Sequence, residues 1–515
     1  MPIYNTAELN DFTMKNLSPD QASWIYNGLD CCVTHEVYGK LTYLLENEPE
    51  NVRLTYQFSL DKQAPIMEMS MRGLLVDQPA RFRALSIFED EQARLKKSFD
   101  YLCMKVFDQT INPQSPPQLL KLFYTFLGMR PVRKRNARGE MTPTVNREAL
   151  EKFRGNLYAQ VFSNFVLNFR DLGKKISFLR TQIDPDGRMR TSYNIAGTNT
   201  GRLAASMNEF GTGTNSQNID TTLRFPFIAS PKKILINVDL EQADARNVGA
   251  RIYCQFRDEF GDEEAGRYLN ACESGDLHTS VCAMAWKNLD WPSPWDMKTA
   301  KAIAQQPFYR DMSYRDAAKR LGHGTNYLGT PRTMAMHTKT EVSIIETFQH
   351  RYFGAFPLIP KWHQWVLEQL RDTGCLTTLY GRRRFFFGRW KDPATHREAV
   401  AYEPQSMTAW QIDAGYLNLW RHMPEAELLV QVHDSIQFQL ELRSLDRLLP
   451  QALELLKHKI ILPGDREFFV PLEAKVGWNW GDASESSPSG LVKWTGSETR
   501  IPPSYNKKCK LKDFL

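Results

Sequence analysis

The stretch "VQVHDSIQFQL" (residues 430–440) is the most informative part of the sequence. It places a carboxylate at a position where a strand would normally carry a core residue. With the two-residue period of a strand, one apolar face holds Val430, Val432, Ile436, Phe438 and Leu440. Asp434 falls on that same face. The alternative is a strand that folds back at Asp434–Ser435, although Asp-Ser is a weaker hairpin signal than Asn-Gly. Either way, a buried carboxylate is costly unless it is paired or binds a metal ion.

A second carboxylate stands at the end of another apolar run, "ILINVDLEQADAR" (234–246). The pattern predicts a buried strand that ends at Asp239, with a helix directly after it. If Asp239 and Asp434 face one cleft, they repel by about 4 kcal/mol at a separation of about 4 Å. Two divalent cations would remove that repulsion and form a phosphoryl-transfer site. The alternative is that Asp239 only caps the following helix.

A stripe of basic and aromatic residues recurs every four positions in "RDAAKRLGHGTNYLG" (315–329). Its members are Arg315, Lys319, His323 and Tyr327. On a helix they span about 18 Å, which matches a nucleoside triphosphate. The glycines within the stretch weaken the helix prediction, and an ordinary solvated face is the alternative.

Composition limits the class of protein. The 515 residues are enough for roughly three domains or one large enzyme with several subdomains. A net charge of +6 does not by itself indicate a nucleic-acid binder. The eight cysteines form no C-x-x-C pair, which predicts reduced thiols and no structural zinc. No leader or membrane-length apolar run is present, so we expect a soluble, unexported protein with no membrane partner.

The three stretches together resemble the polymerase motifs of family A DNA polymerases, the bacterial DNA polymerase I-like group, of phage type. The first palm motif, D-x-x-Q-x-E-x-R, is matched by Asp239, Gln242, Asp244 and Arg246. The fingers motif, R-x3-K-x3-F/Y-x3-Y, is matched by the stripe from Arg315 to Tyr327. The second palm motif, Q-V-H-D-E, is matched by Gln431, Val432, His433, Asp434 and Ser435.

Further motifs extend the resemblance over about residues 55–483. "TNTGRLAAS" implies that Arg202 lies at the primer terminus, and "GDLHTSV" implies that His278 reaches the triphosphate. "TLYGRRR" and "HREAVAYEPQSMTAW" fall at family positions that contact template and primer. The DNA-binding residues implied by the resemblance are Arg202, Arg383, Arg397, Gln405, Gln431 and His433.

The implied fold is α+β, a right hand with an antiparallel-sheet palm, helical fingers and a helical thumb. The expected parts are an exonuclease-like helical remnant (1–54), palm entry (55–79), thumb (80–190), palm (191–262 and 376–483), fingers (263–375) and tail (484–515). We expect the tail to be poorly ordered, with its basic end free rather than docked on a partner. A basic loop at 128–144 is either a solvated turn or a phosphate contact.

The implied activity is template-directed DNA synthesis in phage-type replication, in the cytoplasm of a bacterial host. The primer 3′-OH attacks the α-phosphate of a dNTP, with two Mg²⁺ ions held by Asp239, Asp434 and the Leu240 carbonyl. Primer–template DNA and dNTPs are the partners. The nucleotide-binding residues implied by the resemblance are Gln242, Asp244, His278, Arg315, Lys319, His323 and Tyr327.

Several positions depart from the family pattern. Asp244 replaces a glutamate that packs against the sugar 2′ position, which predicts weaker ribonucleotide discrimination. His323 replaces Phe or Tyr, which predicts altered dideoxynucleotide discrimination. Ser435 replaces an accessory glutamate, and Ala401 stands where Asn is frequent.

"YNGLD" (Tyr26–Asp30) resembles the last motif of the family's 3′–5′ exonuclease domain, whose other carboxylates are missing here. It is either a remnant, a sign of a separate exonuclease subunit or other replisome partner, or a chance pair. No proofreading by this chain alone is expected.

Two other functions compete with DNA synthesis. A single-subunit RNA polymerase shares the paired aspartates, but fewer than 200 residues precede the palm. A catalytically silent DNA-binding subunit is the non-enzymatic alternative, and the intact set of motif residues argues against it.

Overall fold

A five-stranded antiparallel sheet lies at the centre of the molecule. The computed structural model describes residues 18–136, 138–309, 312–485 and 487–503. The strand order is β13-β14-β8-β17-β18. The bounds are β8 (Lys233–Leu240), β13 (Glu427–Val432), β14 (Ser435–Glu441), β17 (Leu472–Gly477) and β18 (Val492–Lys493). We call this sheet the palm sheet.

The stretch 430–440 forms a hairpin and not one straight strand. Val432 pairs with Ser435, so His433 and Asp434 form a two-residue turn between β13 and β14. His433 adopts a positive φ of 55°, the left-handed backbone that such tight turns require. The hairpin alternative is therefore confirmed, and the turn lies one residue earlier than Asp434–Ser435.

The two faces of β8 differ in chemistry. Ile234, Ile236 and Val238 are buried in the main core, which includes residues of the long helix α16 (Pro393–His422) and of α17 (Leu445–Leu456). The opposite face carries Asn237 and Asp239 toward the end of the strand. Because one face is fully apolar, a slip of one residue would bury both polar side chains in the core, and the register is fixed.

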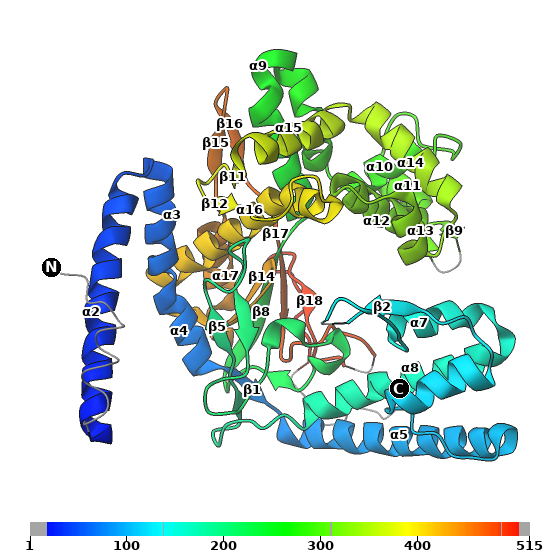
Figure 1. The fold of residues 1–515 in the computed structure, drawn as a ribbon. Coiled ribbons are helices and arrows are strands. Elements are labelled where there is room, and N and C mark those ends of the chain that lie inside the picture. The colour runs from blue at the N-terminus through cyan, green and yellow to red at the C-terminus, as the bar shows by residue number, and fades with distance from the viewer. Residues whose placement is uncertain (1–17, 137, 310–311, 486, 504–515) are drawn as a thin grey trace.

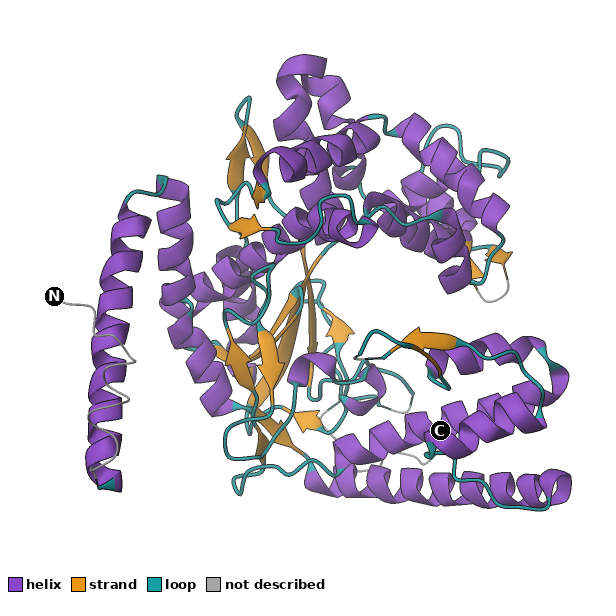
Figure 2. Ribbon diagram, viewed as in Figure 1, coloured by secondary structure: helices purple, strands orange, loops and turns teal. Residues whose placement is uncertain are grey.

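Two groups of helices flank the palm sheet (Figures 1 and 2). The long pair α5 (Gln78–Phe107) and α8 (Leu157–Leu179) forms the arm drawn at the lower right. It shares a separate core with the shorter elements α6 (Pro116–Leu120), η2 (Lys121–Phe126), α7 (Arg147–Lys152) and η3 (Phe153–Gly155). The basic loop forms the exposed hairpin of β2 (Arg133–Arg135) and β3 (Met141–Pro143).

The second group lies above the sheet in Figure 1 and begins with α9 (Ala243–Glu273), which is kinked at Gly261. It continues through α10 (Leu277–Ala285), α11 (Met297–Ala304), β9 (Pro307–Tyr309), β10 (Met312–Ser313), α12 (Tyr314–Asn326), α13 (Pro331–Thr338), α14 (Val342–Ala355) and α15 (Leu358–Thr373). This architecture confirms the α+β class with an antiparallel central sheet and two helical lobes. The exact domain boundaries stay a prediction.

Small elements connect these parts. One three-stranded sheet joins β1 (Leu74–Val76), β4 (Arg188–Met189) and β7 (Phe227–Ile228). Two-stranded sheets pair β5 (Ser192–Asn194) with β6 (Ala204–Ser206), β11 (Cys375–Thr377) with β12 (Arg383–Phe385), and β15 (Ile460–Leu462) with β16 (Arg466–Phe468). Short 3₁₀ turns are η4 (Ser216–Asn218), η5 (Thr221–Leu223) and η6 (Leu442–Ser444).

The N-terminal helices stand at the left edge of Figure 1. They are α2 (Pro19–Glu46), α3 (Glu50–Asp61) and α4 (Gln63–Arg72). Helix α2 begins with a capping box at Ser18 and contains no buried residue. Its exposed large apolar side chains include Trp24, Tyr26, Val33, Tyr38 and Leu44.

The segment after residue 484 was expected to be a poorly ordered tail, and the structure corrects this expectation. Residues 487–503 do not form a loose tail, because β18 pairs with β17 and Leu491 is buried. The basic end, residues 505–515, lies outside the described residues. Among the helices in the described part of the chain, none combines the length and apolar character that a membrane crossing requires.

Candidate active site

Asp239 and Asp434 come together at one end of the palm sheet. Asp239 is the seventh residue of β8 and pairs with Ser435, the residue directly after Asp434. The Leu240 amide donates a hydrogen bond of 3.0 Å to the Asp434 carbonyl oxygen. The hairpin turn thus holds the backbone of one acidic residue against the strand end that carries the other.

The two carboxylates repel each other in a partly desolvated setting. Burial, and after it the charge of Asp434, raise the pKa of Asp239 to about 6. The pKa of Asp434 is also raised, first by desolvation within the surrounding protein, although its side chain reaches the surface of the turn. Pairs of carboxylates with raised pKa values are typical of functional sites. An aspartate that only caps a helix does not require a second carboxylate beside it.

The pair fits hard divalent cations. Carboxylate oxygens are the ligands that Mg²⁺ prefers, and Mg²⁺ typically takes one or two of them together with water and substrate phosphates. In the parts of the chain that the structure describes, no group of three or more His, Cys, Asp or Glu side chains is placed to hold an ion. Such an ion would therefore share its coordination among the two aspartates, water and substrate. The role of the Leu240 carbonyl stays a prediction.

The stripe of four predicted from the sequence lies on α12 and its C-terminal cap. Arg315, Lys319 and His323 belong to the helix, which runs unbroken to Asn326 in spite of its two glycines. The imidazole of His323 meets the ring of Tyr327 edge-on, with 4.7 Å between the ring centroids. Lys319 is exposed, and no hydrogen bond or ion pair to another described residue occupies its ammonium group.

Arg315 is held by an acidic residue that the sequence analysis did not single out. Its Nε and Nη2 donate to the two carboxylate oxygens of Asp276, at 2.6 and 3.0 Å. Asp276 also caps α10, the helix that carries His278. Burial lowers the pKa of His278 to about 4, so this imidazole is neutral at physiological pH. An anionic ligand of Arg315 would compete with Asp276 for the guanidinium.

The model of DNA polymerase family A matches residues 84–285 and 296–482, which is well over half of the chain. The chain belongs to DNA polymerase family A.

Relatives of this family A chain include thermostable bacterial polymerases. It is 28% identical to DNA polymerase I of Thermus filiformis over 80% of its own length and 26% identical to that of Thermus aquaticus over 89%. These matches cover 46% and 52% of the relatives, so the chain spans about half the length of the curated relatives it matches.

A solved structure shows the same fold. It is the POL domain of an M. smegmatis polymerase in complex with DNA primer-template and dNTP. The TM-score is 0.65 at 22% identity, and the match covers 82% of this chain and 69% of that chain. The right-hand fold with helical fingers and thumb is therefore confirmed for this family A member.

Asp244, which replaces the family glutamate, is held from three sides. The Tyr327 hydroxyl donates to its Oδ2 at 3.0 Å, and the Thr408 hydroxyl donates to its Oδ1 at 2.8 Å. Arg202 lies 3.7 Å from the same Oδ1. The shorter side chain therefore still reaches the tyrosine that ends the fingers stripe. Thr408 was missed by sequence reasoning, since nothing in "PQSMTAW" marks a threonine as special.

The two glutamines of the palm motifs, Gln431 and Gln242, differ in how their buried side chains are hydrogen-bonded. Gln431 is buried, and its side-chain amide donates to the His433 carbonyl oxygen at 2.7 Å, while its side-chain Oε1 accepts from Gln217 Nε2 at 3.0 Å. It braces the hairpin turn. Gln242 adopts a positive φ of 56° before α9, and its buried side-chain oxygen has no hydrogen-bond partner among the described residues.

Three predicted DNA-binding residues lie outside this cluster. Arg383 on β12 pairs with Glu48 at 2.8 Å, Arg397 is exposed on α16, and Gln405 is partly buried on the same helix. In the described chain, no hydrogen bond or ion pair joins them to the two aspartates. Their contact with DNA stays a prediction, as do the DNA contacts of Arg202, His433 and Gln431.

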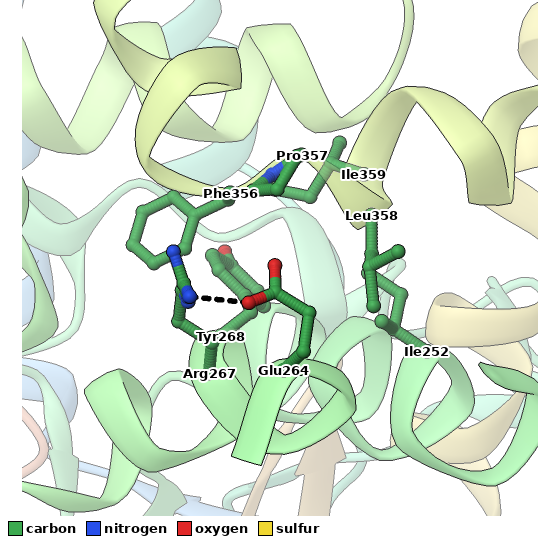
Figure 3. A pocket seen from close by; sticks show the side chains of 8 residues that line it. All are labelled: Ile252, Glu264, Arg267, Tyr268, Phe356, Pro357, Leu358 and Ile359. Atoms are coloured by element: carbon green, nitrogen blue, oxygen red, sulfur yellow. Dashed lines mark hydrogen bonds and ion pairs between the residues drawn. The ribbon is translucent and has the colours of Figure 1, made fainter. Parts of the chain in front are cut away.

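A separate small cavity lies between α9 and the junction of α14 and α15 (Figure 3). Its lining is mainly apolar, with Tyr268, Phe356 and Leu358, and its volume of about 10 Å³ is too small for a substrate. None of the candidate site residues lines it.

Proposed function

We propose that this chain catalyses template-directed DNA synthesis, adding dNTPs to a primer 3′-OH. The observation that carries the proposal is the pairing of Asp239 and Asp434 at adjacent strand ends in a family A chain. Motif resemblance supports phage-type DNA replication in a bacterial cytoplasm as its setting. Primer–template DNA and dNTPs are the proposed ligands.

In the proposed reaction, the primer 3′-hydroxyl loses its proton to water, and its oxygen forms a bond to the α-phosphorus of the dNTP. The bond to the bridging oxygen breaks, and pyrophosphate leaves. Arg315 and Lys319 neutralise charge on the triphosphate, and Arg315 gives up Asp276 when it does so. His323 and Tyr327 close over the sugar and base, which excludes water and mispaired nucleotides.

We further propose that Asp239 and Asp434, with the Leu240 carbonyl, hold two Mg²⁺ ions. When bound, such ions help to activate the attacking hydroxyl and offset charge on the phosphates. The raised pKa values of both carboxylates support this assignment, because like charges in one desolvated site favour a bound cation.

Primer extension tests the proposal. A labelled primer–template is incubated with dNTPs or rNTPs and Mg²⁺, using the parent chain and Asp434→Ala. Glu441→Ala is the matched control, because Glu441 ends β14, the strand that begins directly after Asp434, and its carboxylate pairs with exposed Arg443. We expect dNTP extension by the parent and the control and none by Asp434→Ala.

The other outcomes identify the rival functions. Efficient extension with rNTPs and not dNTPs would identify an RNA polymerase. DNA binding without extension in any condition would identify a silent subunit. Equal extension by Asp434→Ala and the parent would show that Asp434 is not required for the reaction.

Asp244→Glu is expected to strengthen ribonucleotide discrimination. The longer side chain moves the carboxylate about one methylene toward the sugar 2′ position, and a change of this size alters selectivity by about tenfold. Steady-state kcat/KM ratios for dNTP and rNTP measure it. Unchanged ratios would show that Asp244, anchored by Tyr327 and Thr408, does not act as the ribose gate.

His323→Phe is expected to increase discrimination against dideoxynucleotides. A neutral imidazole offers a hydrogen-bonding group beside the sugar that phenylalanine lacks. Desolvation lowers the pKa of His323, so the discrimination of the parent stays constant between pH 7 and 9. Chain-termination ratios across this pH range test both points, and a steep change in the parent would contradict the neutral state.

The isolated chain is expected to leave a 3′-mismatched primer intact. Tyr26 and Asp30 of the exonuclease-like motif lie exposed on α2, far in sequence from the palm carboxylates. A 5′-labelled mismatched primer incubated with Mg²⁺ and no dNTP provides the assay. Shortening that disappears in Asp30→Ala would reveal a nuclease site in this chain.

The exposed large apolar side chains of α2, among them Trp24, Tyr26 and Tyr38, support the proposal that a second polypeptide covers part of this helix. Exposed apolar patches of this kind are typical of interaction surfaces. A separate exonuclease subunit, or another replisome protein, is the proposed occupant.

A further inference from the structure

Asp239 has a hydrogen-bond partner on its own strand. Asn237 lies two residues earlier on β8, so both side chains project from the same face of the sheet. The Asn237 Nδ2 donates to the Asp239 Oδ2 at 2.6 Å. Chemistry fixes the orientation of this amide, because an ionised carboxylate only accepts and the NH₂ group must face it.

The setting of Asn237 makes this bond persistent. Its side chain is only 8% exposed, so water does not compete freely for the amide. The neighbouring cationic residue, Lys475, is the partner of Asn237 on β17, and its ammonium group lies 2.9 Å from Asp482. A neutral donor therefore makes the hydrogen bond with Asp239, while Lys475 acts on Asp239 through its charge, which lowers the pKa of this carboxyl.

A neutral donor suits a metal-binding carboxylate better than a paired cation does. It occupies one side of Oδ2 and fixes the plane of the carboxylate without neutralising the charge that attracts the ion. The charge of Asp434 acts against the ionised Asp239 carboxylate. A donor that holds Oδ2 therefore limits how far this carboxylate can turn away from Asp434.

We infer that Asn237 is a positioning residue that orients Asp239 for metal binding, an inference that rests on the proposed function. No sequence motif assigned a role to this position. Hydrogen-bond partners of metal ligands typically contribute 10- to 100-fold to metal affinity or activity.

The neighbouring strand offers a matched control. Gln437 on β14 is the other partner of Asn237 and is 1% exposed, yet neither of its amide atoms has a hydrogen-bond partner among the described residues. Asn237→Leu and Gln437→Leu thus remove a buried amide from adjacent positions on one sheet. Only the first removes a contact with Asp239.

Mn²⁺ binding, followed by the electron paramagnetic resonance signal of the free ion, tests the inference. The full chain is mixed with a dideoxy-terminated primer–template and the matching dNTP, so no turnover occurs. We expect Asn237→Leu to weaken Mn²⁺ binding about tenfold, and Gln437→Leu to match the parent within twofold. Asn237→Thr keeps a hydroxyl donor in a side chain suited to a strand, and should recover part of the loss.

Kinetics provide a second readout. In primer extension at saturating Mg²⁺, Asn237→Leu should lower kcat and leave the dNTP KM unchanged within twofold. If Asn237→Leu does not fold, Asn237→Ala replaces it with the same expectation.

Equal Mn²⁺ affinity in parent and Asn237→Leu would overturn the inference, as would equal losses in both leucine variants. A parent that extends primers but binds no Mn²⁺ at the two aspartates would also overturn it and leave DNA synthesis standing. A parent that extends no primer would instead refute the proposed function.

Discussion

Asp239→Asn is expected to abolish primer extension and, in metal-free buffer, to stabilise the folded chain. The substitution removes a carboxylate that would bind metal ions at the reacting phosphate, a contribution of several kcal/mol. We therefore expect a loss of at least about 1,000-fold in extension rate. The gain in stability arises because the parent carries two repelling carboxylates in one desolvated site.

The gain in stability depends on pH in a defined direction. The folded-state pKa of Asp239, about 6, lies above the ordinary value of 3.8, so the folded state binds its proton more tightly than the unfolded state. The contribution of protonated Asp239 to the free energy of unfolding is fully present below pH 4 and is lost as the pH rises to about 6. The variant has no such loss, and its free energy of unfolding should exceed that of the parent by about 3 kcal/mol at pH 7 and above.

Urea unfolding at pH 4 and pH 8 in EDTA measures this difference. Glu441→Gln is the control, and we expect it to match the parent in both stability and extension. An Asp239→Asn variant that is less stable than the parent at pH 8 would show that the carboxylate contributes favourable contacts in the absence of metal. An active variant would exclude Asp239 from the reaction.

Lys319→Ala is expected to lower kcat/KM for dNTPs roughly 10- to 100-fold. Its ammonium group is exposed and makes no ion pair in the described chain, so its loss would remove the proposed phosphate contact without weakening the fold. Arg315 differs, because Asp276 already holds its guanidinium. The effect of Lys319 should therefore fall on the nucleotide and leave thermal stability unchanged.

Single-nucleotide incorporation over a range of dNTP concentrations provides the measurement. Arg320→Ala is the matched control, because Arg320 is an exposed cation one position further along α12 and points about 100° away around the helix. Equal losses in both variants would indicate a general effect of charge on DNA binding. An unchanged kcat/KM in Lys319→Ala would show that the triphosphate does not contact Lys319.

The sequence determined the local parts of this protein well. The four-residue spacing from Arg315 to Tyr327 places these side chains along α12 and its cap because helical geometry depends only on separation along the chain. The apolar run before Asp239 predicted the buried strand, which ends one residue later than expected, at Leu240. Several motifs in the expected order together indicated the family, although each of them alone would have been weaker evidence.

Tertiary structure decided which of these parts meet. Periodicity could not choose between a straight strand and a hairpin at Asp434, because both alternate in the same way. The contacts of Thr408 with Asp244 and of Arg315 with Asp276 join residues 164 and 39 positions apart, and no local pattern encodes them.

The contact between Asn237 and Asp239 shows the same limit at short range. An asparagine on the polar face of a strand is unremarkable until the neighbouring strands bury it beside a charge. The segment from residue 487 likewise reads as a tail, yet β18 completes the edge of the palm sheet. Burial and pairing between strands are properties of the whole fold, whereas spacing along a helix or strand is a property of the sequence alone.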